Sequence, residues 1–360
     1  MVALGAVGGV AMAVSALAHG ALGEAEAVAA TAPLPRSLPM RVRLRHTAPL
    51  ASPPVAVAAA PVAVLEPMLA TVFPGTDDEL LAPLTGTLKK TKVNRGGTSL
   101  SLRVELESGA RAAFKPLQIH PQSDPRRELA AYRIDRMLHV GHVPPARSVV
   151  FTADELVRGA PWSTRDYVER RIDDETIAPG GLVRGVESWW IPEIIDVKLE
   201  GKRIDDLDGM ALWASYLQVD SDLPPKLRGL LAQISTCVVF DVIIDNADRW
   251  SGSNAKGSPD GKTLYFMDNT LAFSSFTLGH NSNLHPLHHV QVFSRDLIGR
   301  LRTLTPENLT ATLGQGDDSG LAPLLKPDEI HAILARRDHV VRYVDDLIAE
   351  FGEDAVLAFP

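Results

Sequence analysis

The sequence predicts an α+β fold in which a small antiparallel sheet precedes a mainly helical part. Residues 84–117 form three short runs of alternating apolar and polar residues, separated by turns that contain glycine, which is typical of antiparallel strands. Residues 324–352 instead carry apolar side chains at helical spacing. Strands that come before the helices, rather than alternating with them, favour two segregated parts over a parallel β/α arrangement.

Composition excludes several classes of function. The chain has 360 residues, of which 45% are hydrophobic and 22% charged, as is ordinary for globular proteins. A formal net charge of -8 and a pI near 5.8 argue against nucleic-acid binding and against binding to anionic membranes, since both need a basic surface. The single cysteine, Cys237, has no disulfide partner in the chain, so we expect a small buried hydrophobe there.

The N-terminal region is predicted to lie outside the folded domain. Residues 1–20 are apolar and uncharged, with small residues near the end of the run, which indicates a signal peptide or a short membrane anchor. Residues 21–70 are rich in Ala, Pro and Val and are expected to be a disordered linker. Apart from this anchor no membrane contact is expected. A working leader would make the protein extracytoplasmic (secreted, periplasmic or membrane-anchored), and otherwise it would be cytoplasmic.

A lysine and a glutamate stand out in the first part of the domain. Lys115 follows Ala112, Ala113 and Phe114 in a strand that should be mostly buried, where an ammonium group needs an anionic partner. Glu128 lies in the first turn of a helix that is expected to begin with Asp124-Pro125. Glu128 could pair with Lys115 or merely complement the helix dipole, and Lys115 could instead extend to the strand end.

Two acids follow rigid elements in the stretch 238–273. The apolar run 238–244 must be a core helix or a core strand, and Asp245, Asn246, Asp248 and Arg249 follow it. A Pro-Asp-Gly turn then leads into a β-rich run, 263–267, which ends at Asp268. In phosphoryl transfer one carboxylate orients the attacking hydroxyl, while a second one and an amide hold the metal. The alternative is that the acids near Asp248 cap a helix and that Asp268 begins an ordinary turn.

Three motifs together resemble a known family. They are FKP with the following ELAAYRIDRMLHVGHVPPA, then VFDVIIDNADRW, and finally FMDNTLAF. These motifs are similar to those of the atypical secretory-pathway kinase family, which includes the Golgi casein kinase, the xylose kinase of proteoglycan synthesis and four-jointed, with the toxin kinase HipA more distant. The resemblance runs from about residue 84 to the C-terminus. It implies a bilobal protein-kinase-like domain over 71–360, with an N-lobe at about 71–168, a C-lobe at about 169–360 and an ATP cleft between them.

The resemblance also implies roles for individual residues. Lys115 would contact the phosphates of ATP, and Glu128 would be its partner and a route to the metal. Asp248 would be the catalytic acid of the N-x-D-R segment, and Asp268 would bind Mg²⁺ or Mn²⁺. In many kinase-like folds a metal-binding Asn lies five residues after the catalytic Asp, whereas here Asn254 lies six residues after it. Either the loop bulges and Asn254 still binds metal, or the second metal position is degraded.

Two further segments are candidates for nucleotide binding. Gly96 and Gly97 form a tight turn between two expected strands, and its backbone could lie against a phosphate or be a plain turn. The backbone around Val168 and Glu169, between the two halves of the domain, is interpreted as the hinge that would bind the adenine edge. The acids at 205–208 are expected to be a solvated turn.

The sequence therefore predicts an ATP-dependent phosphotransferase that moves the γ-phosphate to a hydroxyl of a protein or glycan acceptor. Two other functions stay open: an inactive pseudokinase that binds nucleotide or a partner, and transfer of the nucleotide itself, AMPylation. Four histidines at 280, 285, 288 and 289 suggest zinc binding. This interpretation is not favoured, because no thiol lies nearby and no His-x3-His pair is expected on a clear helix.

Overall fold

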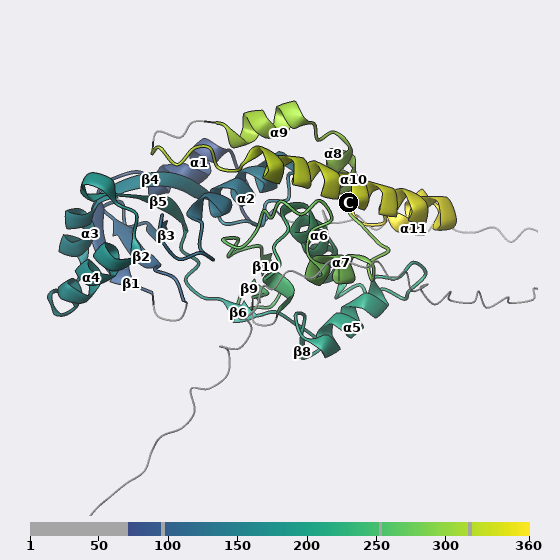
Figure 1. Ribbon diagram of the computed structural model, residues 1–360. Coiled ribbons are helices and arrows are strands. Elements are labelled where there is room, and N and C mark those ends of the chain that lie inside the picture. Colours follow the sequence, from purple (N-terminus) through teal and green to yellow (C-terminus); the bar gives the residue numbers. More distant parts are fainter. Residues whose placement is uncertain (1–70, 95–97, 252–253, 316–318) are drawn as a thin grey trace, which may run out of the picture. The chain divides into compact units, whose positions relative to one another are not determined.

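A five-stranded antiparallel sheet forms the first part of the domain. The computed structural model describes residues 71–94, 98–251, 254–315 and 319–360. Strands in the sheet follow the order β1-β2-β3-β5-β4, with every neighbouring pair antiparallel (Figure 1). The first three strands are the meander that the sequence predicted for 84–117. The strand bounds are β1 (Leu88–Val93), β2 (Leu102–Leu106), β3 (Arg111–Pro116), β4 (Ala146–Thr152) and β5 (Leu182–Trp189).

Different helices pack against the two faces of this sheet. On one face α3 (Ala153–Gly159) and α4 (Arg165–Glu175) pack over a core that contains Phe114. Successive side chains of a strand point to opposite faces, so Lys115 points the other way. It is paired across the sheet with Val186, which belongs to the core that includes helix α2 (Pro125–Met137). The alternation in β3 therefore directs Lys115 toward α2.

Helix α6 (Arg228–Ile244) is the centre of the second part of the domain. All its residues from 234 to 244 are buried. The apolar run 238–244, for which the sequence allowed a core helix or a core strand, is therefore part of a core helix. The long helix α10 packs against it (Figure 1). The remaining helices of the described residues are α1 (Asp77–Leu81), α5 (Leu207–Tyr216), α7 (Asn281–Leu287), α8 (Arg295–Arg302), α9 (Pro306–Leu313), α10 (Pro327–Phe351) and α11 (Glu353–Val356), besides short 3-10 turns.

Short strands connect the two parts. Strands β10, β9 and β6 form a small antiparallel sheet, and β7 pairs with β8. The predicted Pro-Asp-Gly turn is present, with the N–H of Gly261 donating to the Ser258 carbonyl over 2.8 Å and a φ of 71° at Gly261. Only two of the predicted strand residues 263–267 pair in a ladder. The bounds are β6 (Ile195–Asp196), β7 (Lys198–Leu199), β8 (Lys202–Arg203), β9 (Lys256–Gly257) and β10 (Leu264–Tyr265).

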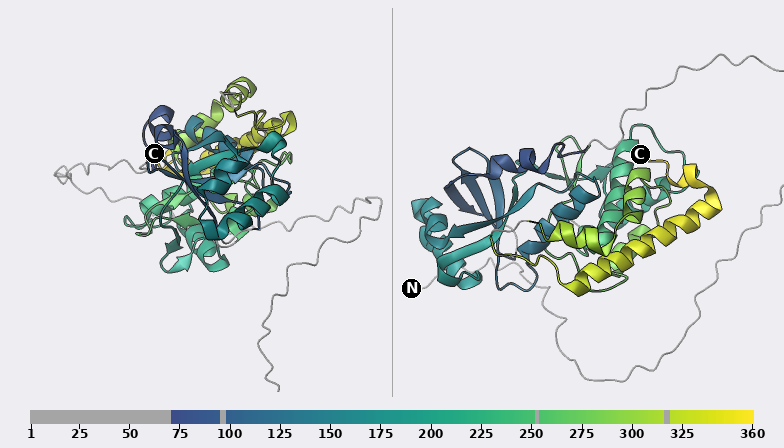
Figure 2. Two further views of the ribbon diagram at one scale, coloured as in Figure 1. Left: turned by 90° about the vertical axis from the view of Figure 1, so that its left-hand side faces the viewer. Right: turned by 90° about the horizontal axis from the view of Figure 1, so that it is seen from above.

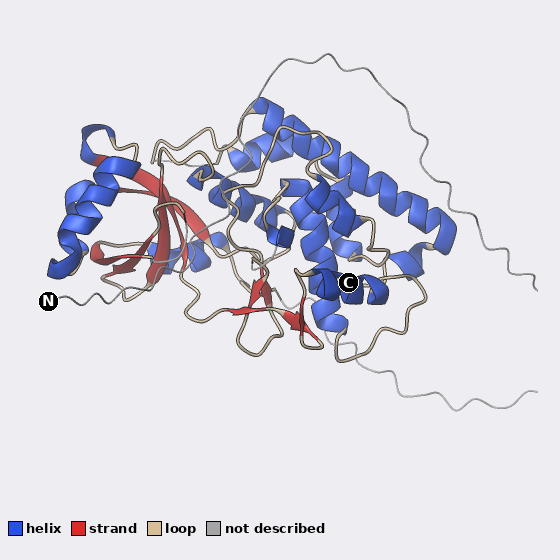
Figure 3. Cartoon of the chain, turned by 60° about the horizontal axis from the view of Figure 1, so that its bottom comes forward, coloured by secondary structure: helices blue, strands red, loops and turns tan. Residues whose placement is uncertain are grey.

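The predicted bilobal α+β fold is confirmed. Figure 2 and Figure 3 show the five-stranded sheet in one part of the domain and most helices in the other. The boundary differs from the predicted one between 168 and 169, because α4 and then β5 still belong to the sheet lobe, which extends to Trp189. Cys237 is buried, as expected. The predicted leader and linker lie outside the described residues. Within those residues, no helix combines the length and apolarity that a bilayer span requires.

Candidate active site

Lys115 and Glu128 form an ion pair between β3 and α2. The helix begins where the sequence predicted, since the Asp124 side chain accepts the N–H of Arg126 over 3.1 Å and Pro125 occupies the first turn. This start places Glu128 one turn into the helix, facing the sheet. Its carboxylate accepts a hydrogen bond from the ammonium of Lys115, and both side chains are largely buried. Glu128 thus supplies the anion that a buried lysine needs.

Asp268 brings a second carboxylate to the same ammonium. Its Oδ1 atom accepts a hydrogen bond of 2.9 Å from Lys115 Nζ, while 58% of its side chain stays exposed. Attraction to Lys115 lowers the pKa of Asp268 and outweighs the opposing effect of burial. Burial acts to lower the pKa of Lys115, but the charges of Asp268 and Glu128 prevail and raise it. At neutral pH Lys115 and Asp268 are therefore both charged.

The backbone next to Asp268 is fixed as well. Asp268 has a φ of 61°, a left-handed conformation that is uncommon outside glycine but tolerated by Asp. The following N–H, that of Asn269, donates to Glu128 Oε1 over 3.1 Å. Glu128 therefore binds both the lysine and the backbone that presents Asp268. Strand β3, helix α2 and the segment after β10 meet at this one carboxylate.

Asp248 and Asn254 form the other half of the site. Helix α6 ends at Asp245 in a left-handed conformation, and Asp248 follows three residues later at an intermediate burial. The side-chain amide of Asn254 donates to Asp248 Oδ2 over 2.7 Å and to its carbonyl oxygen over 2.9 Å. Although Asn254 lies one residue beyond the usual position, its side chain reaches Asp248.

Buried amides and a guanidinium link the two halves. The amide of Asn246 donates to the carbonyl oxygen of Asp268 over 3.2 Å and to Asn269 Oδ1 over 3.0 Å. Arg249 donates to the same Asn269 Oδ1 over 2.9 Å. The neighbours of Asp248 on both sides thus bind the Asp268-Asn269 segment. One network of hydrogen bonds therefore joins all five of Lys115, Glu128, Asp268, Asp248 and Asn254.

Arg249 is a fully buried charge of this network. Its side chain and that of Asp241 are both fully buried, with Nε 3.2 Å from Asp241 Oδ2, and its guanidinium also donates to the Met267 carbonyl. Burial raises the pKa of Asp241, against the attraction of Arg249. Asn246, Arg249 and Asn269 are all buried, and they fix the positions of the exposed residues.

Asp205 is a residue of the site that the sequence prediction missed. It is 4% exposed, and its Oδ2 atom accepts the backbone N–H groups of Asn254 and Ala255 over 3.0 and 3.2 Å. Arg203 binds the other carboxylate oxygen. The expectation of a solvated turn at 205–208 is therefore wrong for Asp205. Nothing in the local sequence distinguishes it from the acids beside it.

A second buried network fixes the end of α6. Asp245 accepts hydrogen bonds from the backbone and ring of His280 and from the Asn283 amide, all within 2.9 Å. Arg336 of α10 is fully buried and donates to the carbonyl oxygens of Ile243 and Phe276 over 3.1 and 2.7 Å. Helix α10 and the segment after Asp268 are thereby joined to the helix that presents Asp248.

Comparison with known proteins finds relatives of the chain. No family model matches the chain. Two curated relatives are the glycosaminoglycan xylosylkinases of Homo sapiens and Danio rerio, which are 23% and 25% identical to it over 333 residues, with 79% of each protein covered. The chain is similar to these members of the atypical secretory-pathway kinase family, which supports the resemblance that its motifs indicate. These relatives are kinases by name, and they support the prediction of a kinase.

Solved structures support the fold of this family. The crystal structure of the Golgi casein kinase matches with a TM-score of 0.62 at 16% identity, covering 80% of this chain and 79% of that one. The same kinase with Mn/ADP bound gives 0.60 at 18%, covering 78% of each chain. The structure of hydra Fam20 with sugar gives 0.59 at 17%, covering 80% and 94%. These likenesses concern the kinase-like fold alone.

Of the two predicted nucleotide contacts, one lies outside the described residues and the structure contradicts the other. Gly96 and Gly97 lie outside the described residues. Val168 and Glu169 lie in the middle of α4, where Val168 is buried in the core on the far face of the sheet from Lys115. The interpretation of these two residues as a hinge is wrong. Their N–H and carbonyl groups lie inside an α-helix, whose own ladder uses them.

Proposed function

We propose that the chain transfers the γ-phosphate of ATP to a hydroxyl group of a glycan or protein acceptor, assisted by Mn²⁺ or Mg²⁺. The observation that carries this proposal is the position of Lys115, held between Glu128 and Asp268 on the network that also contains Asp248. An oriented lysine, a carboxylate for the metal and a carboxylate for the acceptor are the parts that phosphoryl transfer requires.

Asp268 and Asn254 would hold the divalent cation. Asp268 is ionised and more than half exposed. The NH₂ group of Asn254 is bound to Asp248, which leaves the amide oxygen as the ligand atom. Within 71–360 as far as described, no group of three His, Cys, Asp or Glu residues could hold a metal by itself. That suits a cation held by one or two carboxylates and completed by phosphate oxygens and water. When bound, it would neutralise charge on the phosphates.

Lys115 would contact the phosphate groups and Asp248 the acceptor. The ammonium has two carboxylate partners that fix its direction, so little rotamer freedom remains to be lost when a phosphate binds. The Asn254 amide holds Oδ2 of Asp248 in place. The Asp248 carboxylate would then orient the attacking hydroxyl and take its proton.

The family's named members support a glycan or protein as the acceptor. The relatives found by sequence are named glycosaminoglycan xylosylkinases, and one structural neighbour was solved with sugar. Another structural neighbour is named Golgi casein kinase, so its name gives a protein as the substrate. We therefore propose a secretory acceptor and an extracytoplasmic site of action, which agrees with the leader expected at 1–20.

The decisive experiment compares wild type with Asp248→Asn in the full chain. Purified protein is incubated with γ-labelled ATP, Mn²⁺ or Mg²⁺, and a panel of glycosides and secreted proteins. Asp248→Asn should lower transfer by about 10²–10⁴-fold while ADP binding, measured by calorimetry, is retained. Asp166→Asn, an exposed acid of α4, is the matched control and should leave transfer unchanged.

Two outcomes would contradict this proposal. Wild-type protein that binds ADP but transfers no label to any acceptor would identify a pseudokinase. Label that reaches the acceptor from α-labelled ATP would identify AMPylation, and the intact mass of the acceptor would show the added nucleotide.

A further inference from the structure

The segment that precedes the sheet, residues 71–84, carries an aromatic residue that contacts two others at once. Phe73 in this segment is only 6% exposed. Its ring centroid lies 6.0 Å from that of Trp189, with the planes at 79°, and 6.3 Å from that of Tyr265, with the planes at 33°. Both distances lie in the range of direct aromatic contact, about 4.5–7 Å between centroids. Phe73 is therefore packed between the two rings.

The two partners of Phe73 lead to opposite sides of the candidate active site. Trp189 is the last residue of β5, which pairs with β3, the strand of Lys115. Tyr265 is the last residue of β10, and Asp268 follows it by three residues. One buried ring thus joins the sheet that carries Lys115 to the segment that carries Asp268.

The backbone of Phe73 is held by the loop that follows α2. The N–H groups of Val72 and Phe73 both donate to the carbonyl oxygen of Gly141, over 3.0 and 3.1 Å. Gly141 has a φ of 70°, a left-handed conformation that favours glycine. Its own N–H donates over 3.1 Å to the fully buried carboxylate of Asp135 on α2. The position of Phe73 is therefore tied to that helix.

A second contact joins the same segment to α2. The Oδ1 atom of Asp77 accepts hydrogen bonds from the hydroxyl of Tyr132 over 2.8 Å and from Nε of Arg136 over 2.9 Å. Both donors lie on α2, toward its C-terminal end, whereas Glu128 lies in the first turn. Segment 71–84 thus fixes the end of the helix that is remote from the ion pair of Glu128 with Lys115.

The spacing between the two sides matters for the proposed chemistry. Lys115 would contact the phosphates of the nucleotide from the sheet, and the metal on Asp268 would contact them from the segment after β10. A displacement of about 1 Å by a change far from the reacting atoms can lower a rate by about 10²-fold. The aromatic contacts of Phe73 can therefore affect the rate, although its ring would touch neither nucleotide nor metal.

We propose that Phe73 is a positioning residue of the phosphotransferase centre, which sets the spacing between Lys115 and Asp268 through its contacts with Trp189 and Tyr265. The effect on rate rests on the proposed function. The effect on the spacing between the two lobes does not, and it can be measured without any activity assay.

The kinetic test compares Phe73→Ala with wild type in the full chain. We expect kcat for phosphate transfer to fall by about 10²-fold, while KM for ATP changes much less, because the variant keeps every group assigned to nucleotide and metal. Phe73→Leu keeps most of the side-chain volume but loses the flat ring, so it should show a smaller loss of kcat in the same direction. This second variant replaces the first if Phe73→Ala does not fold.

Phe151→Ala is the matched control. Phe151 is also 6% exposed, and its ring lies 5.1 Å from that of Phe114 with the planes at 83°. Both of these rings belong to strands of the five-stranded sheet, so their contact stays within the sheet lobe. Phe73→Ala and Phe151→Ala remove the same ring and should lower the melting temperature similarly, but only Phe73→Ala should lower kcat strongly.

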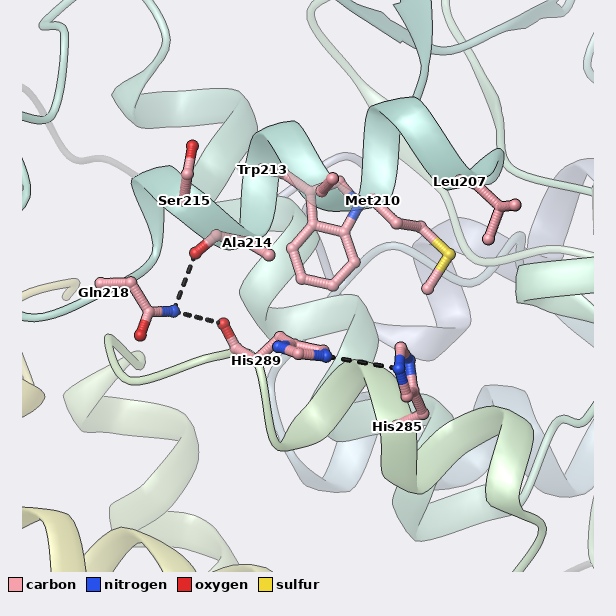
Figure 4. A pocket seen from close by; sticks show the side chains of 9 residues that line it. Leu207, Met210, Trp213, Ala214, Ser215, Gln218, His285 and His289 are labelled. Atoms are coloured by element: carbon pink, nitrogen blue, oxygen red, sulfur yellow. Dashed lines mark hydrogen bonds between the residues drawn. The ribbon is translucent and has the colours of Figure 1, made fainter. Parts of the chain in front are cut away.

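The lobe spacing itself is measured by double electron–electron resonance between two spin labels. The single cysteine, Cys237, is buried, so the labels react with introduced cysteines. Asp166→Cys places one label on an exposed position of α4 in the sheet lobe. Ser215→Cys places the other on α5 in the helical lobe. Ser215 is exposed at the edge of a cavity, and Figure 4 shows its side chain directed away from His285 and His289.

The distance between the labels, recorded without nucleotide, decides the positioning role. Phe73→Ala should shift or broaden the distance distribution, and Phe151→Ala should leave it unchanged. An unchanged distribution in Phe73→Ala would overturn the proposal, and so would equal kcat in Phe73→Ala and wild type. If wild-type protein transfers no phosphate, the proposed function fails, and the distance distribution alone decides whether Phe73 positions the two lobes.

Discussion

The ammonium of Lys115 lies 2.9 Å from the Oδ1 atom of Asp268, which follows it by 153 positions in the chain. Glu128 binds the same ammonium and also the backbone N–H after Asp268. The contact between lysine and aspartate therefore depends on a residue of a third element. A nucleotide that approaches this centre meets a cation whose direction is already set.

Replacement of Lys115 should abolish most transfer. Lys115→Met keeps the length of the side chain but removes the charge that would contact the phosphates. We expect kcat to fall by about 10²–10³-fold, as for loss of one donor to a transition-state charge, when phosphate transfer is measured at saturating metal. Lys90→Met, an exposed lysine paired with Glu105 at the sheet surface, is the control. Equal activity of the two variants would refute the role of Lys115.

Asp205 should affect the metal requirement more than the maximal rate. Asp205→Asn keeps the size of the side chain but removes the negative charge that accepts the N–H groups of Asn254 and Ala255. Asn254 is then held less firmly against Asp248. The metal concentration for half-maximal activity should rise by about 10–100-fold, with a smaller change in kcat at saturating metal.

Asp208 provides the comparison for this variant. Its side chain is 82% exposed and, among the described residues, pairs with Lys202 at 4.0 Å, so Asp208→Asn should leave the metal dependence unchanged. If Asn254→Ala shifts the metal requirement and Asp205→Asn does not, the carboxylate of Asp205 has no positioning role.

Loss of Arg249 should destabilise the fold strongly. Both charges of the Asp241–Arg249 pair are fully buried, and removal of one partner leaves an unpaired buried charge. Arg249→Met should therefore lower the free energy of unfolding by about 3–5 kcal/mol, measured by urea denaturation. The double variant Asp241→Asn/Arg249→Met should lose less than the sum of the two single variants. Strict additivity would show that the pair is not coupled.

His142 should make stability depend on pH. The ring is fully buried, its Nδ1 lies 2.6 Å from the Leu264 carbonyl oxygen, and it stacks on Phe266. Burial lowers its pKa from 6.5 to about 4, so the unfolded chain binds the proton first. The stability that neutral His142 contributes is present above pH 6.5 and is lost as the pH falls toward 4, by up to about 1.4 kcal/mol per pH unit.

A comparison with His142→Asn isolates this contribution. The amide of asparagine can donate to Leu264 as Nδ1 does but does not titrate. The stability advantage of wild type over this variant should shrink between pH 6.5 and 4.5 in urea denaturation. Burial raises the pKa of the neighbouring Asp135 to about 7, which has the opposite effect on stability. Asp135 is present in both proteins, so its effect cancels in the difference. A constant difference would show that His142 is not the titrating group.

Some residues of the site could be predicted because each is unusual in its local sequence. Lys115 is a charge in an otherwise apolar strand, and Glu128 follows a clear helix start at Asp124-Pro125. Asp248 and Asp268 come directly after elements whose burial is readable from their apolar runs. In each case the residues on either side in the sequence indicate the strand or helix that positions the functional side chain. The family motifs then connect the four residues.

Other residues carried no such local signal. Asp205 stands in an acidic run that resembles a solvated turn, and its partners are backbone N–H groups 49 and 50 positions later. Only the folded chain brings them together. The hinge was misplaced because helices α3 and α4 lie between β4 and β5 in the chain. The periodicity of a helix does not show whether the strand after it belongs to the same sheet as the strand before it.

Arg336 gives helix α10 a part in the proposed chemistry, although no residue of that helix belongs to the site. Its guanidinium ties the last turn of α6 to the segment after Asp268. A premature stop codon or a protease cut upstream of Arg336 would spare all five residues assigned to nucleotide, metal and acceptor. The shortened polypeptide would nevertheless lose the hydrogen bonds of Arg336 that hold α6 against the segment after Asp268. Loss of function on such truncation is therefore no evidence that a catalytic group has been removed.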